Sequence, residues 1–357
     1  MQLHSLKAIK AIQGPILITG HTGFKGAWLS LLLRKLGVET AGISLPAEKH
    51  SLCMRLKASV VNQEYLLDIR NKEKLTEVIQ KIRPIAVFHL AAQPLVLDSY
   101  KDPVGTFETN VIGTANILNA AFKVDSVRSI ICATTDKVYR NNEQGISFTE
   151  SDALAGKDPY SASKVGSESA IAAWQQISRI EGGPRVMAVR AGNVIGGGDY
   201  ANDRLLPDLI RGVETGNTTV IRNPGSTRPW QHVLDPLFGY VLLLEASLQR
   251  EMPTAFNFGP TGPSLGVKEV AEIAKSVWSE KIKYEITKSN AEIESGKLQL
   301  NSNLAKSILN WEPVWSQNDS IIATIKWWKK VILNEGSALS ACQADIVNLG
   351  ESYELFK

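Results

Sequence analysis

The sequence predicts an α/β protein built on a doubly wound parallel sheet with helices on both faces. Two observations lead to this fold class. Short apolar runs alternate with helical patterns through the first half of the chain, and a glycine-rich turn joins the first apolar run to the first helical pattern. Such alternation is typical of parallel sheets, whose strands end at one common edge where ligands bind.

The elements can be assigned in order along the chain. The predicted strands are the aliphatic runs Ile16–Thr19, Thr40–Leu45, Ala86–Leu90, Ser129–Thr134 and Arg185–Ala191. The helical patterns between them include Lys72–Lys81, Val104–Phe122 and Ala162–Ile180. Beyond Gly192 the pattern loosens. There we expect a strand that returns to the sheet and two small helices, at Ala255–Gly259, Val267–Trp278 and Asn303–Leu309.

The turn after the first strand has the form of a phosphate-binding turn, Gly20-His21-Thr22-Gly23-Phe24-Lys25-Gly26. Its glycines would let the backbone approach a pyrophosphate, and the following helix would offer free N–H groups. The first gap between glycines is one residue longer than in the usual dinucleotide fingerprint, and an ordinary turn can have the same composition. The expected cofactor contacts in this turn are Gly20, Thr22, Gly23, Phe24, Lys25 and Gly26.

Other strand ends also suit a dinucleotide. Asp68 follows the strand-like run Tyr65–Leu67, where its carboxylate would accept a hydrogen bond from an adenine amino group. The second strand ends without the acid that binds adenosine ribose hydroxyls and without an arginine for a 2′-phosphate, although Lys49 and His50 are close. We predict NAD as the cofactor. The remaining contacts expected for it are Ile69, Leu90, Ala91, Ala92, Thr109, Tyr160 and Lys164.

We expect two lobes and a tail. Residues 1–195 and 232–259 would form the dinucleotide-binding lobe, which is of Rossmann type, and residues 196–231 and 260–331 a smaller, discontinuous α/β substrate-binding lobe. Residues 332–357 show no strong period. This tail is expected either to be partly disordered or to pack on another surface.

Candidate catalytic residues lie at a strand end and on the helix that follows. Tyr160 and Lys164 are four residues apart, so they share a helix face, and a nearby ammonium would lower the pKa of the phenol. Such a tyrosine can take a proton from an alcohol as hydride leaves the carbon. Thr135 could hydrogen-bond that alcohol, and Asp136 could donate a proton if burial raises its pKa. The spacing of Tyr160 and Lys164 also arises by chance, and a polar strand end can simply satisfy backbone groups.

Several arginines suit an anionic substrate. Arg204, Arg222 and Arg228 are interleaved with Asn193 and Trp230, and guanidinium groups bind diphosphates bidentately. Trp230 would line this site or belong to the core. The five histidines show no ligand spacing, so we expect no metal site. The full set of expected substrate contacts is Gln93, Asn193, Arg204, Leu205, Arg222, Arg228 and His232.

Composition excludes several classes of protein. The net charge of +3 is too small to indicate nucleic acid or an acidic membrane surface as a partner. The longest apolar run, Tyr240–Leu244, is too short to span a bilayer, and residues 1–13 do not resemble a signal peptide. Three widely spaced cysteines fit neither a disulfide scaffold nor a metal site. We therefore expect a cytoplasmic protein.

Taken in order, these motifs resemble the extended short-chain dehydrogenase/reductase family, and within it the nucleotide-sugar 4,6-dehydratases of the CDP-glucose type. The resemblance covers residues 14–328, nearly the whole chain. It is carried by the phosphate-binding turn, His89–Val96 with Asp102-Pro103, Thr135–Lys137 with Tyr160 and Lys164, Arg190–Asp199 and Arg228–Val233. The chain departs from the CDP-glucose pattern at Ser99-Tyr100 and over Asn141–Gly156.

The resemblance implies conversion of a nucleotide hexose into its 4-keto-6-deoxy form with bound NAD. Tyr160 would remove the C4 hydroxyl proton, Thr135 would orient that hydroxyl, and Lys164 would tune Tyr160 and bind the nicotinamide ribose. Asp136 would protonate the departing C6 hydroxyl. Lys137 would be the base at C5 or would stabilise enolate charge, and both roles stay open.

Alternative functions are a nucleotide-sugar 4-epimerase, a dehydratase of another nucleotide hexose, or a non-catalytic NAD-binding regulator. The product of a dehydratase would enter deoxysugar synthesis for a surface polysaccharide such as lipopolysaccharide O-antigen. The two long helical stretches at 104–122 and 162–180 either pack on the sheet or pair across a dimer axis. With the resemblance, they predict a homodimer or a higher homo-oligomer.

Overall fold

The computed structural model describes residues 6–142, 145–221, 224, 226–279, 281–287 and 298–355. Its centre is a sheet of seven strands in the order β12-β7-β5-β4-β1-β2-β3, and every neighbouring pair is parallel. The strands are β1 Ile16–Thr19, β2 Thr40–Ser44, β3 Gln63–Leu66, β4 Ala86–His89, β5 Ser129–Ala133, β7 Arg185–Ala191 and β12 Ala255–Phe258. The predicted fold class is confirmed.

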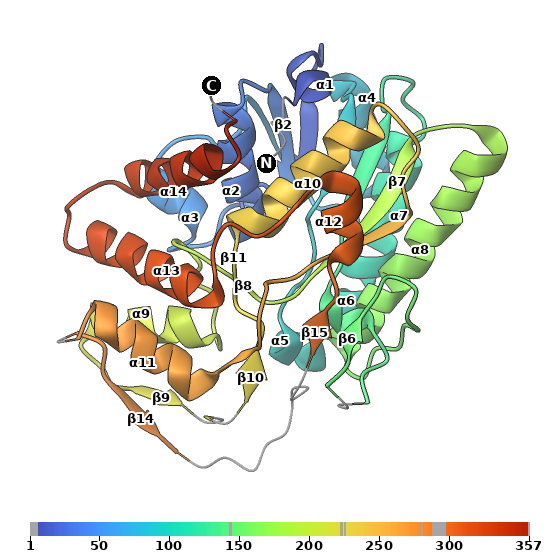
Figure 1. The fold of residues 1–357 in the computed structure, drawn as a ribbon. Coiled ribbons are helices and arrows are strands. Elements are labelled where there is room, and N and C mark those ends of the chain that lie inside the picture. The colour runs from blue at the N-terminus through green and yellow to red at the C-terminus, as the bar shows by residue number, and fades with distance from the viewer. Residues whose placement is uncertain are drawn as a thin grey trace.

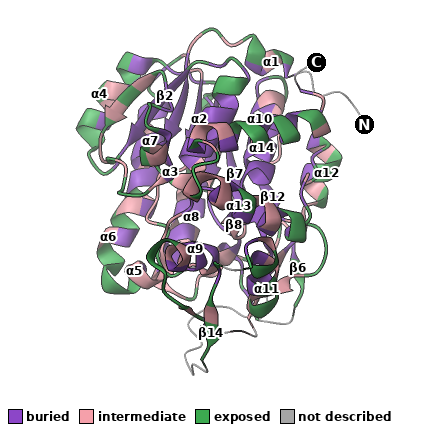
Figure 2. Cartoon of the chain, turned by 90° about the vertical axis from the view of Figure 1, so that its left-hand side faces the viewer, coloured by how far each residue is buried: buried purple, intermediate pink, exposed green. Residues whose placement is uncertain are grey.

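Alternate residues of the strands face two separate cores, which is why both faces of the sheet carry helices. Ile16 and Ile18 join the core beneath α2 (Phe24–Lys35) and α10 (Leu234–Ser247). Leu17, between them, joins the opposite core. The helices on that second face are α4 Lys72–Ile82, α7 Gly113–Ala121 and α8 Pro159–Glu181. Figure 2 shows the resulting buried sheet between partly exposed helices.

The start of α8 is fixed by its sequence. Asp158 caps the helix by accepting from the Ser161 amide at 2.9 Å, and the Ser161 hydroxyl accepts from the Asp158 amide at 3.0 Å. Pro159 occupies the first turn, where its missing N–H costs nothing. These local signals place Tyr160 and Lys164 in the first turns of a long helix.

The predicted helical stretch Val104–Phe122 is confirmed, and it contains one π-helical turn that the sequence pattern did not indicate. An α-helical turn, α6 Pro103–Phe107, is followed by a π-helical turn, η1 Glu108–Ile112, and then by α7. Such π turns occur frequently at functional sites. Both η1 and α7 lie against α8.

Part of the chain after β7 gathers at one end of the molecule, at the lower left of Figure 1. There α9 (Leu205–Thr215) and α11 (Val267–Val277) lie beside the parallel pair β9 (Thr219–Ile221) and β14 (Tyr284–Ile286). The small helices α11 and α12 (Asn303–Leu309) form where they were expected. The division into two lobes at the stated residues stays a prediction.

The tail packs on the molecule, so partial disorder is the wrong alternative for its described residues. After α13 (Gln317–Ile332), α14 (Ala338–Ser352) lies against α2 and α3, as Figure 1 shows. Ser337 caps α14, and Cys342, Ile346 and Leu349 are buried. The remaining short elements are α1 Lys7–Lys10, α3 Leu52–Leu56, α5 Val96–Lys101, η2 Asp136–Val138, β6 Ser147–Phe148, β8 Val194–Ile195, β10 Thr227–Arg228, β11 Gln231–His232, β13 Leu265–Gly266 and β15 Gln299–Leu300.

Of the helices that the structure describes, none is long and apolar enough to cross a membrane.

Candidate active site

The phosphate-binding turn lies where the strand order reverses, between β1 and β4. Gly20 follows β1 with φ of +76°, a conformation that favours glycine. A Cβ on Gly20 would lie 2.9 Å from the Ala91 amide nitrogen, so the turn and the residues after β4 touch backbone to backbone. Switch points of this kind are the usual dinucleotide sites of doubly wound sheets.

The turn is shaped to receive a pyrophosphate. Gly23 is the N-cap of α2, and no described side chain caps that helix end. A Cβ on Gly26 would overlap the Gly20 carbonyl, so this turn can close only with glycine there. Uncapped amides at a helix N-terminus bind anions, and Gly20, Gly23 and Phe24–Gly26 therefore fit the phosphates of NAD.

The adenosine side differs in part from expectation. The Thr22 hydroxyl is 2.6 Å from the Ser44 hydroxyl and donates to the Leu45 carbonyl, which ties the turn to the end of β2. Both carboxylate oxygens of Asp68 accept from the Arg70 guanidinium, at distances from 2.7 to 3.2 Å. These contacts lower the pKa of Asp68, mainly through its hydrogen bond with Arg70. Asp68 is thus ionised and already paired.

Two other predicted cofactor residues are placed differently from each other. Ile69 is buried, and its side chain touches the position that a Cβ on Gly113 would take. Thr109 lies in the π turn and is half-buried. Leu90, Ala91 and Ala92 follow β4 and are also half-buried, beside the phosphate-binding turn.

The end of β5 carries the segment Thr135–Val138, which we call the catalytic segment. Thr135 caps a short helical turn, η2, by accepting from the Lys137 amide. Its hydroxyl donates to the Asp136 carboxylate at 3.0 Å and is hydrogen-bonded to Tyr160. The structure therefore brings Thr135, Asp136 and Tyr160 together in one hydrogen-bonded group.

The Asp136 carboxyl is almost fully buried. Burial raises its pKa, while Lys137, the Thr135 hydroxyl, Arg228 and Lys25 oppose that increase. A Cβ on Gly192 would lie 2.8 Å from Asp136 Oδ2, so the carboxyl lies directly against the backbone after β7. A carboxyl with a raised pKa holds its proton closer to neutral pH and can act as an acid.

The expected lowering of the Tyr160 pKa is wrong for the chain alone. Burial raises the pKa of Tyr160 to about 12, and the Thr135 hydrogen bond offsets only part of this. Lys164 Nζ instead donates to the Ala133 carbonyl at 3.1 Å. Burial lowers the pKa of Lys164 to about 8. Lys164 thus supports the end of β5, and desolvation is the main cause of the raised Tyr160 pKa.

Cations from separate segments surround this group. The charge of Lys25, from the phosphate-binding turn, interacts with Lys164, Arg204 and Asp136, and burial lowers the pKa of Lys25 to about 8. Arg204 pairs with Asp199 at 3.0 Å and also acts on Tyr160. With Arg228 near Asp136, two predicted substrate residues reach the catalytic group.

The other predicted substrate residues divide into three groups. Leu205 opens α9 beside Arg204, and Asn193 follows Gly192; both are half-buried. The side-chain amide of Gln93 donates hydrogen bonds to the Leu95 carbonyl and the Thr106 hydroxyl. Arg222 lies outside the described residues.

His232 is not brought to the site. Its side chain is fully buried, stacked on Trp315 at 4.2 Å and 3.7 Å from the Asp345 carboxylate. The short strand β11 pairs with β8 inside the molecule, so its side chains face the core. Trp230 is likewise buried and donates to the Leu265 carbonyl, which makes it a core residue.

The sequence interpretation missed Asn110, in the π turn. Its side chain accepts from the Gln93 amide at 2.8 Å and donates to the Gln93 carbonyl and to the Ser163 hydroxyl. It therefore joins the loop after β4 to the turn of α8 between Tyr160 and Lys164. No local pattern marks it, because the π turn that aims it was not expected.

Glu168 and Arg190 were also missed. They form a buried ion pair at 2.8 Å behind the catalytic segment. The spacing of Glu168, one turn beyond Lys164, was the available signal.

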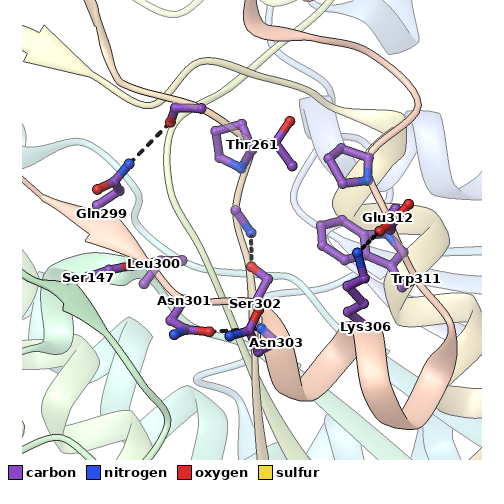
Figure 3. Close-up of a pocket in the computed structure, with 14 residues that line it drawn as sticks. Ser147, Thr261, Gln299, Leu300, Asn301, Ser302, Asn303, Lys306, Trp311 and Glu312 are labelled. Carbon is purple, nitrogen blue, oxygen red and sulfur yellow. Dashed lines mark hydrogen bonds and ion pairs between the residues drawn. The ribbon is translucent and has the colours of Figure 1, made fainter.

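A cavity of about 320 Å³ lies elsewhere, between the loop after β12 and the start of α12 (Figure 3). Its polar groups are bonded to one another, including Lys306 with Glu312 and Gln299 with the Gly262 carbonyl. None of the predicted site residues that the structure describes lines it. Within the described ranges, no group of three or more metal-ligating side chains is found either. The charged group around Asp136 is therefore the candidate site.

Known proteins are similar to this chain over most of its length. A model of the NAD dependent epimerase/dehydratase family matches residues 16–259. A CDP-glucose 4,6-dehydratase of Salmonella typhimurium is 36% identical over 90% of this chain and 92% of its own length. A UDP-glucose 4-epimerase of Rhizobium leguminosarum is 28% identical over 74% of this chain and 83% of its own length.

Solved structures show the same fold. The UDP-glucose 4-epimerase of Thermotoga maritima superposes with a TM-score of 0.77 at 22% identity, over 89% of this chain and 99% of its own. The dTDP-glucose 4,6-dehydratase of Bacillus anthracis, solved in complex with NAD, gives 0.75 at 20% identity, over 89% and 97%. With its family match over the sheet and its phosphate-binding turn, this chain belongs to the NAD-dependent epimerase/dehydratase family.

Proposed function

We propose that this protein is an NAD-dependent nucleotide-sugar 4,6-dehydratase whose substrate is CDP-glucose. One observation carries the proposal: a buried carboxyl, Asp136, is hydrogen-bonded to the same threonine that binds Tyr160. Oxidation of an alcohol needs only the tyrosine and the threonine. Loss of water needs an acid beside them, and the raised pKa of Asp136 suits that role.

Tyr160, Thr135 and Asp136 each have a separate role in the reaction. NAD would be held by the phosphate-binding turn and would supply the hydride chemistry, as the acceptor for C4 and the donor for C6. In its phenolate form, Tyr160 takes the proton of the C4 hydroxyl, and Thr135 orients that hydroxyl. Once C4 is a ketone, the C5 proton becomes acidic, and Asp136 protonates the C6 hydroxyl as it leaves as water. The net reaction removes one water and leaves a 4-keto-6-deoxy sugar.

Lys137 completes the catalytic segment and is half-buried beside Asp136. As a cation it lowers the energy of an enolate that forms between C4 and C5; as a neutral amine it takes the C5 proton. Both roles place its side chain on the same part of the sugar. A pH profile of C5 proton exchange separates them, because only the base requires the neutral amine.

The substrate's pyrophosphate would lie among the cations at the site. Lys25 and Arg228 act on Asp136, and Arg204, from a third segment, acts on Lys25 and Tyr160. Guanidinium forks suit diphosphate oxygens. The choice of cytidine as the base rests on the relative from Salmonella typhimurium.

The testing experiment is mass spectrometry of reaction mixtures. The purified protein is incubated with NAD and, separately, with CDP-, dTDP-, UDP- and GDP-glucose. The proposal expects loss of one water from CDP-glucose. Loss from another nucleotide would keep the reaction and correct the substrate. An isomeric product without mass change would show a 4-epimerase, and no product from any of them would reject the proposal.

Further properties belong to the same proposal. The product would enter deoxysugar synthesis for a surface polysaccharide such as O-antigen. Cys53, Cys132 and Cys342 are all free thiols, which supports a cytoplasmic location. Val104, Phe107 and Ile112 expose an apolar face on α6 and η1, next to α8, and this face supports a homodimer in which the two helices pair with those of a second copy.

A further inference from the structure

A buried ion pair lies behind the catalytic segment. Arg190 Nε and Nη2 donate to the two carboxylate oxygens of Glu168 at 2.8 and 2.9 Å, and the side chains are 6% and 7% exposed. Desolvation of two charges costs about as much as their attraction returns, so such a pair is weak evidence for stability. Its bidentate geometry does fix the relative position of α8 and β7.

The ion pair is hydrogen-bonded to Thr134, the residue that directly precedes the catalytic segment. Thr134 Oγ1 donates to Glu168 Oε1 at 2.6 Å. One turn earlier on α8, Lys164 Nζ donates to the Ala133 carbonyl at 3.1 Å. The end of β5, immediately before Thr135, is therefore tied to the helix that carries Tyr160.

The ion pair is also hydrogen-bonded to Tyr139, the residue that directly follows the catalytic segment. Arg190 Nη1 donates to the Tyr139 hydroxyl at 2.8 Å, and that hydroxyl donates to Asn257 Oδ1 at 2.7 Å. The Tyr139 ring stacks on Phe148 with centroids 4.9 Å apart. Both neighbours of the catalytic segment, Thr134 and Tyr139, are thus bonded to one ion pair.

The strand that carries Arg190 supports the acid as well. Gly192 follows Arg190 by two residues, and its backbone lies against Asp136 Oδ2. The carboxyl is therefore supported by the backbone after β7, while the Tyr160 phenol is carried by α8. The ion pair joins these two elements.

We propose that Glu168 and Arg190 are positioning residues, which clamp Thr134 and Tyr139 so that Thr135 and Asp136 meet the substrate beside Tyr160. The inference rests on the proposed function, since it assigns those three residues to the reaction. Misplacement of reacting groups by about 1 Å can lower a rate about 100-fold, so a rigid frame behind the segment has a measurable value. Neither member of the pair needs to touch the sugar.

Variants that remove one hydroxyl each test the clamp with little change of shape. Thr134→Val and Tyr139→Phe are expected to lower kcat about 10-fold or more, with KM within about threefold, because the binding cations are untouched. Thr134→Ser restores the hydroxyl and is expected to recover the wild-type kcat. A purely structural role would lower the melting temperature and the folded fraction without separating kcat from KM.

A matched control lies on the same strand. Arg185, at the start of β7, pairs with the exposed Glu251 at 2.8 Å, far along the strand from the site. Glu251→Gln breaks that pair and should leave both constants unchanged. Glu168→Gln breaks the buried pair directly and should give the largest loss of kcat among the soluble variants.

Rates are compared per folded protein on whichever reaction the wild type performs, water loss or isomerisation at C4. Both reactions need Thr135 and Tyr160 in place. The product of the wild-type protein therefore tests the proposed function, and the kcat of each variant relative to the wild type tests the positioning role. Wild-type kcat in both Thr134→Val and Tyr139→Phe overturns the inference. A loss of kcat in both, recovered by Thr134→Ser, supports it.

Discussion

The chain has two glycine-rich turns beyond the C-terminal ends of its strands, and their glycines have different neighbours. In the phosphate-binding turn, added Cβ atoms on Gly20 and Gly26 would strike backbone: that of Ala91 and that of the turn itself. In the run Gly196–Gly198, which we call the glycine run, they would strike side chains. These are Val233 against Gly196, Trp327 against Gly197 and Leu52 against Gly198.

The difference separates two uses of glycine. The phosphate-binding turn keeps its own backbone close and leaves amides at the start of α2 for a ligand. The glycine run is seated on the core, where the Trp28 indole also donates to the Gly197 carbonyl at 3.0 Å. It leads directly into Asp199, which pairs with Arg204. Backbone contacts thus shape the phosphate-binding turn, whereas the glycine run packs on core side chains and precedes the Asp199–Arg204 pair.

Among variants of the two turns, the largest effect is expected from Gly26→Ala. The added methyl group would overlap the Gly20 carbonyl, so the phosphate-binding turn must open. We expect NAD affinity to fall about 100-fold, as for other misplacements of about 1 Å, with a smaller loss of thermal stability. Calorimetric titration with NAD measures the affinity. Gly266→Ala is the control, because a Cβ there meets open space, and it should bind NAD normally.

Gly197→Ala should lower the stability of the fold and leave NAD affinity nearly unchanged. Its methyl group would overlap the buried Trp327 ring, and overpacking of this kind costs about 1–3 kcal/mol. We expect a lower free energy of unfolding in a urea titration and NAD affinity within about threefold of the wild type. Equal losses of NAD affinity in Gly26→Ala and Gly197→Ala would remove the distinction between the two turns.

The smallest effect concerns Lys25, which belongs to the phosphate-binding turn and whose charge acts on the catalytic group. Its pKa of about 8 means that it is a cation below pH 8 and loses its charge above it. Lys25→Met is expected to raise the KM for the sugar nucleotide about 10-fold at pH 7, the value of one charge-assisted contact. At pH 9 the two proteins should differ much less. A constant ratio across that range would show that the charge of Lys25 does not act on the substrate.

Features with local causes could be predicted from the sequence. Aliphatic runs predicted the central strands, and the helical pattern over Ala162–Ile180 predicted most of α8, whose start is fixed by the adjacent residues Asp158 and Pro159. The phosphate-binding turn was recognisable because a strand precedes it and a helix follows it. The same reasoning placed Thr135, Asp136 and Tyr160 within reach, since strand ends of a parallel sheet share one edge.

Features with distant causes could not be predicted. The glycine run is explained by Trp327 and Leu52, which lie far from it in the sequence. His232 was expected among the substrate contacts, yet the pairing of β11 with β8 directs its side chain into the core. The high pKa of Tyr160 follows from burial, and no spacing of residues reports burial.

The central claim is that Asp136 is the acid of a dehydration and has no part in C4 oxidation. The most direct measurement compares Asp136→Asn with the wild type on CDP-glucose and follows two signals, water loss by mass spectrometry and reduction of bound NAD by absorbance. We expect water loss to slow about 100-fold or more while NAD is still reduced. Water loss at the wild-type rate would contradict the account, and so would the loss of both signals in a variant that still folds and binds NAD.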